Sequence, residues 1–349
     1  MNERILSLHN IGPIKEATIC LDGLSVIAGE NDTGKSTVAK ILMALIKTKN
    51  ISNAKKSKKD RSKYVSSERE FNILIKQLFD RDLKGESSAI INVMGNKPLY
   101  EVKIKESQCV KFESCDTLYS DCTFIQSPFM WDFYDFFKDV RLVNENAKIY
   151  GGGAKLTYPY LFWDLYLKME RSNSANKYEY IDLKKIKQEI DKVIKGHFAK
   201  QNDKTYRFYR DSQEISLKNV ATGIKQFGIL QVLLNSNWIT PNRFLIFDEP
   251  ENHLHPKWQL KFAEILVKLT ALDRPIPIIV NSHSPNFIEA IYKYSIKHKA
   301  QANFHLADNG SIKKVISNEK TLELIFEKLN QPFEEFQQLD IEILKRRGI

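Results

Sequence analysis

A glycine-rich segment between a predicted strand and a predicted helix constrains the fold of this chain most. Residues 29–36, with the sequence GENDTGKS, match the pattern G-x-x-x-x-G-K-[ST] at every defined position. The apolar run Leu24–Ala28 precedes the segment, and apolar residues at helical spacing follow it from Lys35 to Ile46. A strand, this loop and a helix in that order are typical of a phosphate-binding loop in an α/β protein.

The chemistry of phosphate binding explains the spacing within this loop. Backbone N–H groups must point inward around a phosphate, and Gly29 and Gly34 allow the close approach that this requires. We expect Lys35 to reach the β- and γ-phosphates of ATP and the Ser36 hydroxyl to bind Mg²⁺. The positive end of the following helix adds to the site. The other predicted nucleotide contacts in this segment are Asn31, Asp32, Thr33 and Thr37.

Two later apolar strands end in polar residues and complete the predicted site. Phe244–Phe247 runs into Asp248 and Glu249, and Ile278–Val280 leads to His283. Open α/β sheets bind ligands at the carboxyl ends of their strands, so we expect these tips near the loop. We predict that Asp248 holds Mg²⁺ through water and that Glu249 polarises the water that attacks ATP. His283 is then placed to hydrogen-bond the γ-phosphate and to sense its loss.

The order of predicted elements indicates the fold class. The final third alternates buried strands and helices, which predicts a largely parallel sheet. Short alternating segments near the N-terminus and between residues 89 and 125 predict antiparallel strands. From residue 128 the sequence becomes rich in aromatic side chains, which favours packed helices over a platform for stacking bases. We therefore predict an α/β P-loop fold with a core of residues 1–127 and 205–349, an antiparallel β subdomain, and a helical insertion at 128–204.

Charge and hydropathy narrow the classes of partner. A net charge of +10 fits contact with DNA, RNA or another acidic surface, and the densest basic run is Lys55–Lys63, although such runs are usually solvated loops. No apolar stretch is long enough to cross a bilayer, so we expect a cytoplasmic protein without membrane contact. None of the four cysteines forms a C-x-x-C pair, and we expect reduced thiols.

Taken together, the motifs resemble the bacterial ABC-type ATPases. The resemblance is carried by the glycine loop, by DEPENHLHP at 248–256 and by SHSP at 282–285. Within these ATPases the chain is most similar to the branch that includes RecF, SMC heads and the ATPase half of OLD-family proteins, which also share the pattern IGPI at 11–14. The likeness covers residues 1–50 and 215–295 well and the insertion hardly at all.

The resemblance implies two further contacts with the nucleotide. Gln126 stands where the family's Q-loop contacts Mg²⁺ and signals the nucleotide state. The segment NVATGIKQ at 219–226 resembles the signature motif, which caps the γ-phosphate bound by the opposite protomer, and its predicted contacts are Ala221, Thr222, Gly223 and Lys225. Two departures stand out: the signature differs from Leu-Ser-Gly-Gly-Gln, and Asp32 replaces a glycine found in many relatives. By the same resemblance, the turn containing Glu251, His253 and His255 is structural rather than a zinc site.

The resemblance also implies a function. We expect an ATP- and Mg²⁺-dependent ATPase that forms a homodimer around two nucleotides and switches a separate effector subunit. Because no Toprim or other nuclease constellation is evident in the sequence, the expected effector is a nuclease, acting in bacterial anti-phage defence. The alternative is a RecF-like ATPase of DNA repair or chromosome maintenance that binds DNA directly. A transporter ATPase is a third and weaker reading, because of the long insertion and the altered signature.

Overall fold

The computed structural model describes residues 3–56, 66–79, 85–93, 98–114, 119–150, 158–172, 181–315 and 319–329, with the single positions 339, 341, 343, 344 and 346. Most of the basic run Lys55–Lys63 and the residue Cys115 lie outside these ranges. The strands are β1 (Arg4–Ile11), β2 (Ile14–Cys20), β3 (Leu24–Ala28), β4 (Glu86–Val93), β5 (Tyr100–Lys105), β6 (Gln108–Ser114), β7 (Asp121–Ile125), β8 (His197–Lys200), β9 (Tyr206–Arg210), β10 (Gln213–Ile215), β11 (Arg243–Asp248), β12 (Ile278–Ser282), β13 (Ala302–Asp308) and β14 (Ser311–Val315).

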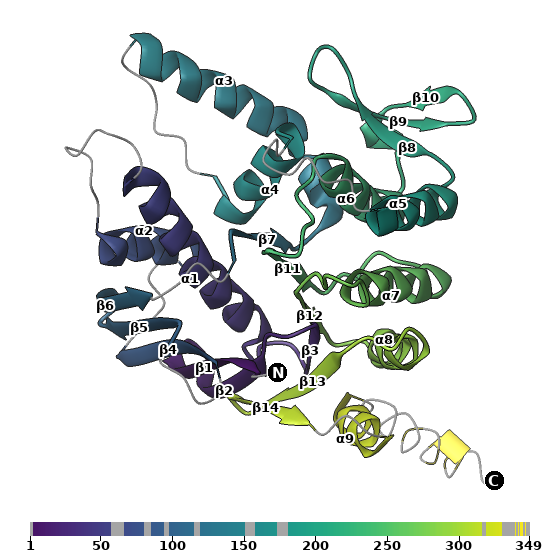
Figure 1. The fold of residues 1–349 in the computed structure, drawn as a ribbon. Helices are drawn as coiled ribbons and strands as arrows, with labels where there is room; N and C mark the ends of the chain where they lie inside the picture. The colour runs from purple at the N-terminus through teal and green to yellow at the C-terminus, as the bar shows by residue number, and fades with distance from the viewer. Residues whose placement is uncertain are drawn as a thin grey trace.

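Eleven of the described strands form one mixed sheet in the order β6-β5-β4-β1-β2-β14-β13-β3-β12-β11-β7 (Figure 1). The neighbours from β13 to β7 are all parallel, whereas the neighbours from β6 to β2 are all antiparallel. Strand β14 joins the two halves, antiparallel to β13 and parallel to β2. The predicted parallel core and antiparallel subdomain are confirmed, and the structure adds that they share one continuous sheet.

Helices cover both faces of this sheet. They are α1 (Lys35–Lys56), α2 (Ser67–Phe79), α3 (Tyr134–Tyr150), α4 (Tyr160–Glu170), α5 (Ile181–Ile194), α6 (Thr222–Asn235), α7 (Pro256–Thr270), α8 (Pro285–Lys297) and α9 (Glu319–Leu329), with 3₁₀ turns η2 (Pro128–Trp131) and η3 (Leu217–Asn219). Figure 1 shows α1 and α2 on one side of the sheet and α7 and α8 on the other.

The period of two in a strand sends alternate side chains of β11 into different cores. Phe244 and Ile246 pack in the core beneath α1, and Leu245 and Phe247 pack in the core beneath α6 to α8. All six residues of β11 are buried, as expected for a strand covered on both faces. The parallel core is thus the most buried part of the fold, and it presents the strand ends that carry the motifs.

The insertion contains more strand than the sequence predicts. Its helices α3, α4 and α5 are followed by β8, which pairs with β9 in a small antiparallel sheet with β10. The hairpin of β8 and β9 spans the predicted boundary after residue 204, because His197 pairs with Tyr209. These strands are short, and nothing in the sequence marked them as distinct from the surrounding helices.

The aromatic residues of the insertion are mainly packed core, as predicted. Trp131, Tyr134, Phe137 and Tyr166 are almost completely buried and contact one another at ring distances of 5.1 to 6.3 Å. Three phenylalanines between the start of η2 and the first turn of α3 differ, because each leaves nearly half of its surface exposed. They are Phe129, Phe133 and Phe136.

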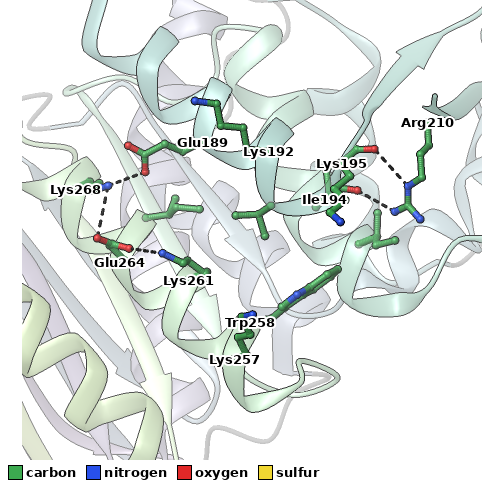
Figure 2. A pocket seen from close by; sticks show the side chains of 13 residues that line it. Glu189, Lys192, Ile194, Lys195, Arg210, Lys257, Trp258, Lys261, Glu264 and Lys268 are labelled. Carbon is green, nitrogen blue, oxygen red and sulfur yellow. Dashed lines mark hydrogen bonds and ion pairs between the residues drawn. The ribbon is translucent and has the colours of Figure 1, made fainter. Parts of the chain in front are cut away.

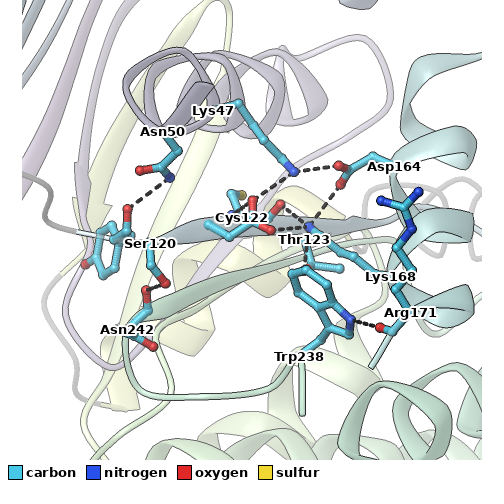
Figure 3. A network of polar contacts seen from close by, with 12 residues as sticks. Lys47, Asn50, Ser120, Cys122, Thr123, Asp164, Lys168, Arg171, Trp238 and Asn242 are labelled. Atoms are coloured by element: carbon cyan, nitrogen blue, oxygen red, sulfur yellow. Dashed lines mark hydrogen bonds and ion pairs between the residues drawn. The ribbon is translucent and has the colours of Figure 1, made fainter. Parts of the chain in front are cut away.

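A buried ion network ties the insertion to the sheet and to α1 (Figure 3). Lys47 of α1 lies 2.5 Å from Asp164 of α4 and 2.8 Å from Asp121 of β7. Lys168 of α4 contacts the same two carboxylates, at 2.9 Å for Asp164 and 3.3 Å for Asp121. Two positive and two negative charges therefore balance inside the protein, which offsets much of the cost of burying them.

Several smaller expectations agree with the structure. The predicted hairpin at Asn309 and Gly310 joins β13 to β14, and both residues have the positive φ that a tight turn needs. Cys20, Cys109 and Cys122 are unbonded and buried. Among the helices of the described ranges, none combines the length and the apolarity that a membrane span requires.

Candidate functional site

Four neighbouring parallel strands bring the sequence motifs to one edge of the sheet. The register pairs Asn281 of β12 with Ile27 of β3 on one side and with Asp248 of β11 on the other. On the far side of β11, Phe247 pairs with Ile125 of β7. The segments that directly follow β3, β12, β11 and β7 are the glycine loop, His283, Glu249 and Gln126. Motifs separated by more than two hundred residues in sequence thus meet at one edge.

The backbone of the glycine loop has no room for side chains at its two motif glycines. A Cβ atom on Gly29 would lie 2.7 Å from the carbonyl oxygen of Ala307, and one on Gly34 would lie 2.6 Å from Ile14 Cγ1. Gly34 also has a φ of +91°, and Asp32 has a φ of +61°. The left-handed conformation at Asp32 gives a physical reason why a glycine would suit this position, since aspartate adopts it at some cost.

Lys35 folds back over its own loop. Its Nζ atom donates hydrogen bonds to the carbonyl oxygens of Gly29, at 2.8 Å, and Glu30, at 2.5 Å. Burial lowers the pKa of Lys35, although the nearby carboxylates of Glu249 and Asp248 act in the opposite direction. A desolvated ammonium group with donors aimed at the loop is a fitting partner for phosphate oxygens.

Ser36 and Asp248 form a cluster of oxygen ligands next to the loop. The Ser36 hydroxyl lies 3.0 and 2.9 Å from the two carboxylate oxygens of Asp248, and the Asn281 amide donates to Asp248 Oδ1 at 2.7 Å. Burial raises the pKa of Asp248 despite these hydrogen bonds. Hydroxyl and carboxylate oxygens are ligands that Mg²⁺ prefers, and a cation here would offset the desolvation of the carboxylate. The residues present therefore fit a magnesium ion.

Glu249 is held at both carboxylate oxygens. Its Oε2 accepts a hydrogen bond from the Asn252 amide at 2.9 Å, and its Oε1 lies 3.1 Å from His283 Nδ1. The backbone φ of Glu249 is +50°, a conformation that turns its side chain away from the direction of the strand. Its N–H donates to the Asn281 carbonyl oxygen at 2.9 Å, which fixes this bend to β12. The predicted base and the predicted sensor are thus in direct contact.

Glu251, which is expected from the sequence only as part of a structural turn, contacts the candidate site. Its carboxylate is buried and accepts hydrogen bonds from Ser282 Oγ at 2.5 Å and from the His283 backbone N–H at 3.3 Å. Burial raises the pKa of Glu251. Glu251 therefore braces the tip of β12 that carries His283. Asn281 was missed as well, and its signal was an amide inside an otherwise apolar run.

The residues that were inferred from resemblance differ in their exposure to solvent. Gln126 is exposed immediately after β7. Ala221 is exposed, and Thr222 and Gly223 are partly exposed, at the N-terminal end of α6. Lys225 instead points into the protein, where its Nζ donates to Asp132 at 2.6 Å. The structure thus presents the first residues of the predicted signature to solvent and holds Lys225 inside.

The turn after Glu249 packs against the start of α6. A Cβ atom on Gly223 would come within 3.4 Å of the His253 carbonyl oxygen in this turn and within 3.2 Å of the Trp258 ring in α7. The His253 ring also lies 5.1 Å from the ring of Phe129 in η2. His255 caps α7, because its Nδ1 accepts a hydrogen bond from the Lys257 N–H at 3.3 Å. These contacts agree with the structural role expected for His253 and His255.

A comparison with known families assigns the chain to one of them. Residues 24–289, more than half of the sequence, match the family described as "AAA domain, putative AbiEii toxin, Type IV TA system". The chain belongs to this family. It is therefore an AAA domain protein with an α/β fold, and the matched range contains the glycine loop and the tips of β11 and β12. Its placement in the OLD-like branch remains a prediction.

Solved structures of SMC head domains are similar to this AAA domain protein at low identity. The SMC head domain from Thermotoga maritima is 14% identical, with 90% of this chain and 98% of that chain covered and a TM-score of 0.44. An SMC head bound to the C-terminal winged-helix domain of ScpA is 12% identical, with coverage of 90% and 98% and a TM-score of 0.49. A third, derived from Pyrococcus furiosus, is 12% identical, with coverage of 93% and 99% and a TM-score of 0.47.

Proposed function

We propose that this protein hydrolyses ATP and uses the cycle of binding and hydrolysis to switch a partner protein. The observation that supports this most is the meeting of Lys35, Ser36, Asp248, Glu249 and His283 at the ends of adjacent parallel strands. These residue types are the ones that phosphoryl transfer to water requires: a cation for the phosphates, oxygen ligands for a metal, and a base for the water.

Each residue has a separate task in this proposal. The Lys35 ammonium exchanges its bonds to the loop carbonyls for bonds to phosphate oxygens. The Glu249 carboxylate accepts a hydrogen bond from the attacking water and takes up its proton, while the Asn252 amide keeps the carboxylate oriented. His283 moves from Glu249 to donate a hydrogen bond to the γ-phosphate. Bound Mg²⁺, held by Ser36 and Asp248, would neutralise negative charge on the phosphates.

We further propose that two copies close around two ATP molecules. The exposed start of α6 supports this, because Ala221, Thr222 and Gly223 lie at its N-terminal end, where helix N–H groups favour an anion. The start of α6 packs against α7 and against the turn after Glu249. A phosphate of the partner's ATP bound at the start of α6 would therefore lie next to the segment that carries the proposed base. Gln126, exposed after β7, is proposed to sense the metal within the same protomer.

The proposed partner is a separate effector, a nuclease, in bacterial anti-phage defence. The family description names a type IV toxin–antitoxin system, which supports a two-component arrangement. The half-exposed Phe129, Phe133 and Phe136 at the start of the insertion offer an apolar surface for such a subunit. Phe129 contacts His253 in the turn after Glu249, so this surface lies close to the part of the site that changes on hydrolysis.

Replacement of Glu249 by glutamine tests the proposed base. Glu249→Gln keeps the size of the side chain and one acceptor oxygen for the Asn252 amide but removes the proton acceptor, so we expect ATP binding to remain. Turnover should fall by roughly a hundredfold or more. With ATP bound and hydrolysis blocked, the closed dimer should accumulate. Steady-state phosphate release, nucleotide binding and light scattering measure the three effects.

A matched control removes the same charge elsewhere. Glu289→Gln changes a carboxylate of α8 that pairs with Lys293, so turnover and mass should not change. Normal hydrolysis by Glu249→Gln would show that the base is another residue. If Glu249→Gln is inactive but stays monomeric with saturating ATP, Glu249 is still the base, but the proposed ATP-bound dimer is wrong.

A further inference from the structure

A second cavity, of about 820 Å³, opens between α5, the start of α6, α7 and the end of β9 (Figure 2). None of the residues from 29 to 37 lines it, and neither do Asp248, Glu249 and His283. Its polar lining is mainly cationic, with only two acidic side chains, Glu189 and Glu264. The cationic residues are Lys192, Lys195, Arg210, Lys257, Lys261 and Lys268. In Figure 2 the Lys192 side chain projects from α5, and those of Lys257, Lys261 and Lys268 project from α7 on the other side of the cavity. Lys195 directly follows α5, and Arg210 is the last residue of β9.

The two acids do not neutralise this surplus of positive charge. Glu264 is shared by Lys261 at 3.2 Å and Lys268 at 3.7 Å, and outside the cavity lining by Lys297 and the His298 ring, each at 3.3 Å. Glu189 accepts from Lys268 at 2.7 Å. Burial alone would raise the pKa of Glu264, but these cations lower it to about 2. Both carboxylates are therefore committed to partners.

Other cations of the cavity have no acidic partner. Lys192, Lys195 and Lys257 make no ion pair within the part of the chain that the structure describes. Arg210 donates to the backbone carbonyl oxygens of Ile194, at 2.9 Å, and Lys195, at 3.3 Å, and it forms no ion pair with another described residue. Their charges remain available to an anion with more than one negative group.

The floor of the cavity is apolar and contains one large aromatic ring. Ile224 and Ile265 lie beside Trp258, which is partly exposed. The indole is held in place, because Phe227 meets it edge-on at 5.6 Å and the start of α6 packs against it at Gly223. A fixed and partly exposed indole is a good surface for stacking a planar ring.

We propose that this cavity binds a short single-stranded oligonucleotide, with its phosphates on the lysines of α5 and α7 and a base against Trp258. A single phosphate would leave most of the volume empty, since cavities of this size take drug-sized ligands. An acidic peptide would satisfy the lysines but would leave the indole without a planar partner. Phosphates and a base together use both features of the cavity.

Fluorescence anisotropy with a labelled, 5′-phosphorylated thymidine trinucleotide tests the site directly. The wild-type protein should bind it, and the double variant Lys192→Gln/Lys257→Gln should bind roughly tenfold more weakly, because it removes one unpaired cation from each side. Trp258→Leu should also weaken binding roughly tenfold, whereas Trp258→Phe keeps an aromatic face and should retain most of the affinity. Thermal unfolding of each variant establishes that it is folded.

One control variant and two competition experiments test whether the binding is specific to this cavity. Lys76→Gln/Lys313→Gln removes the same charge from exposed sites on α2 and β14, and its affinity should equal that of the wild type. A saturating non-hydrolysable ATP analogue should not displace the trinucleotide, and displacement would place it on the glycine loop and overturn the proposal. Equal competition by a triglutamate peptide, with no effect of Trp258→Leu, would overturn it in favour of an acidic peptide.

The natural source of the ligand is distinguished by presenting the same trinucleotide in two forms. If the protein binds the trinucleotide equally well when it is free and when it is the single-stranded overhang of a duplex, the ligand is the end of a longer nucleic acid. If the protein binds the trinucleotide well only when it is free, the ligand is a small oligonucleotide. Weak binding of both forms to the wild-type protein would contradict the proposed site.

Discussion

Polar residues buried behind the reacting groups determine where those groups lie. Glu251 and Asn281 have no predicted contact with ATP, yet each holds a strand tip that does. The Asn281 amide donates to the Asp248 carboxylate, and the Asn281 backbone carbonyl accepts a hydrogen bond from the Glu249 N–H. The Glu251 carboxylate accepts hydrogen bonds from the Ser282 hydroxyl and the His283 backbone N–H. A buried polar group without its partner costs about 1–3 kcal/mol, so these contacts keep the tips in one arrangement.

Removal of the Glu251 carboxylate should impair turnover more than ATP binding. In Glu251→Ala the Ser282 hydroxyl and the His283 N–H lose their acceptor, and we expect His283 to shift and turnover to fall roughly a hundredfold. Glu251→Gln retains an acceptor oxygen, so its turnover should lie between that of the wild type and that of Glu251→Ala. Steady-state kinetics and ATP binding measure the difference. Wild-type turnover by Glu251→Ala would show that the brace has no part in catalysis.

At the scale of elements, a buried histidine connects three strands near the centre of the sheet. His305 of β13 accepts a hydrogen bond at Nε2 from the Cys20 N–H of β2, at 3.1 Å. Its Nδ1 lies 3.2 Å from the carbonyl oxygen of Val26 in β3, which assigns the proton to Nδ1. Both ring nitrogens are used by the neutral form, and protonation would place a second donor against an N–H group.

This contact predicts acid sensitivity in a defined range. Burial lowers the pKa of His305 from its ordinary value of 6.5 to about 4. Between these values the unfolded chain takes up a proton that the folded chain does not, so the free energy of unfolding decreases as the pH falls from 6.5 to 4. The loss should reach roughly 3 kcal/mol. Urea unfolding across this range should show the decrease, and His305→Gln should show a flatter dependence than the wild type.

The ion network between α1, β7 and α4 should tolerate paired changes better than single ones. Burial opposes the charged form of Lys47, but the carboxylates of Asp121 and Asp164 raise its pKa well above the ordinary value. Asp164→Asn leaves an excess positive charge inside the protein and should lower the free energy of unfolding by about 3–5 kcal/mol. Lys47→Met/Asp164→Leu removes one charge of each sign and should recover most of this loss. Urea unfolding measures both, and a loss below about 1 kcal/mol for Asp164→Asn would contradict the network.

At the scale of the whole molecule, the sequence predicted the parts of the fold that carry strong periodicity. The strand before Gly29, the helix after Lys35 and the strand ending at Asp248 have uninterrupted apolar patterns, and each lies where expected. The strands β8 to β10 were missed because they are three to five residues long and only partly buried, which leaves little alternation to detect.

The residues of the candidate site could be predicted where a polar side chain directly follows an apolar strand. Asp248, Glu249 and His283 follow apolar runs, so topology alone brings them to one edge. Glu251 was not predictable in its role, because its partners on β12 lie more than thirty residues away. The basic cavity was hidden for a similar reason: its lysines are scattered over α5 and α7, while the sequence draws attention to the run at 55–63.

The central position of β12 has a consequence for how the protein is made. Strand β12 lies between β3 and β11, so the glycine loop and Asp248 acquire a common register only when residues 278–282 join the sheet. On the ribosome the loop emerges long before that strand, and contacts between such distant segments form late. ATP can therefore stabilise only a nascent chain that already includes β12, and the nucleotide is not a template for the segments made before that strand.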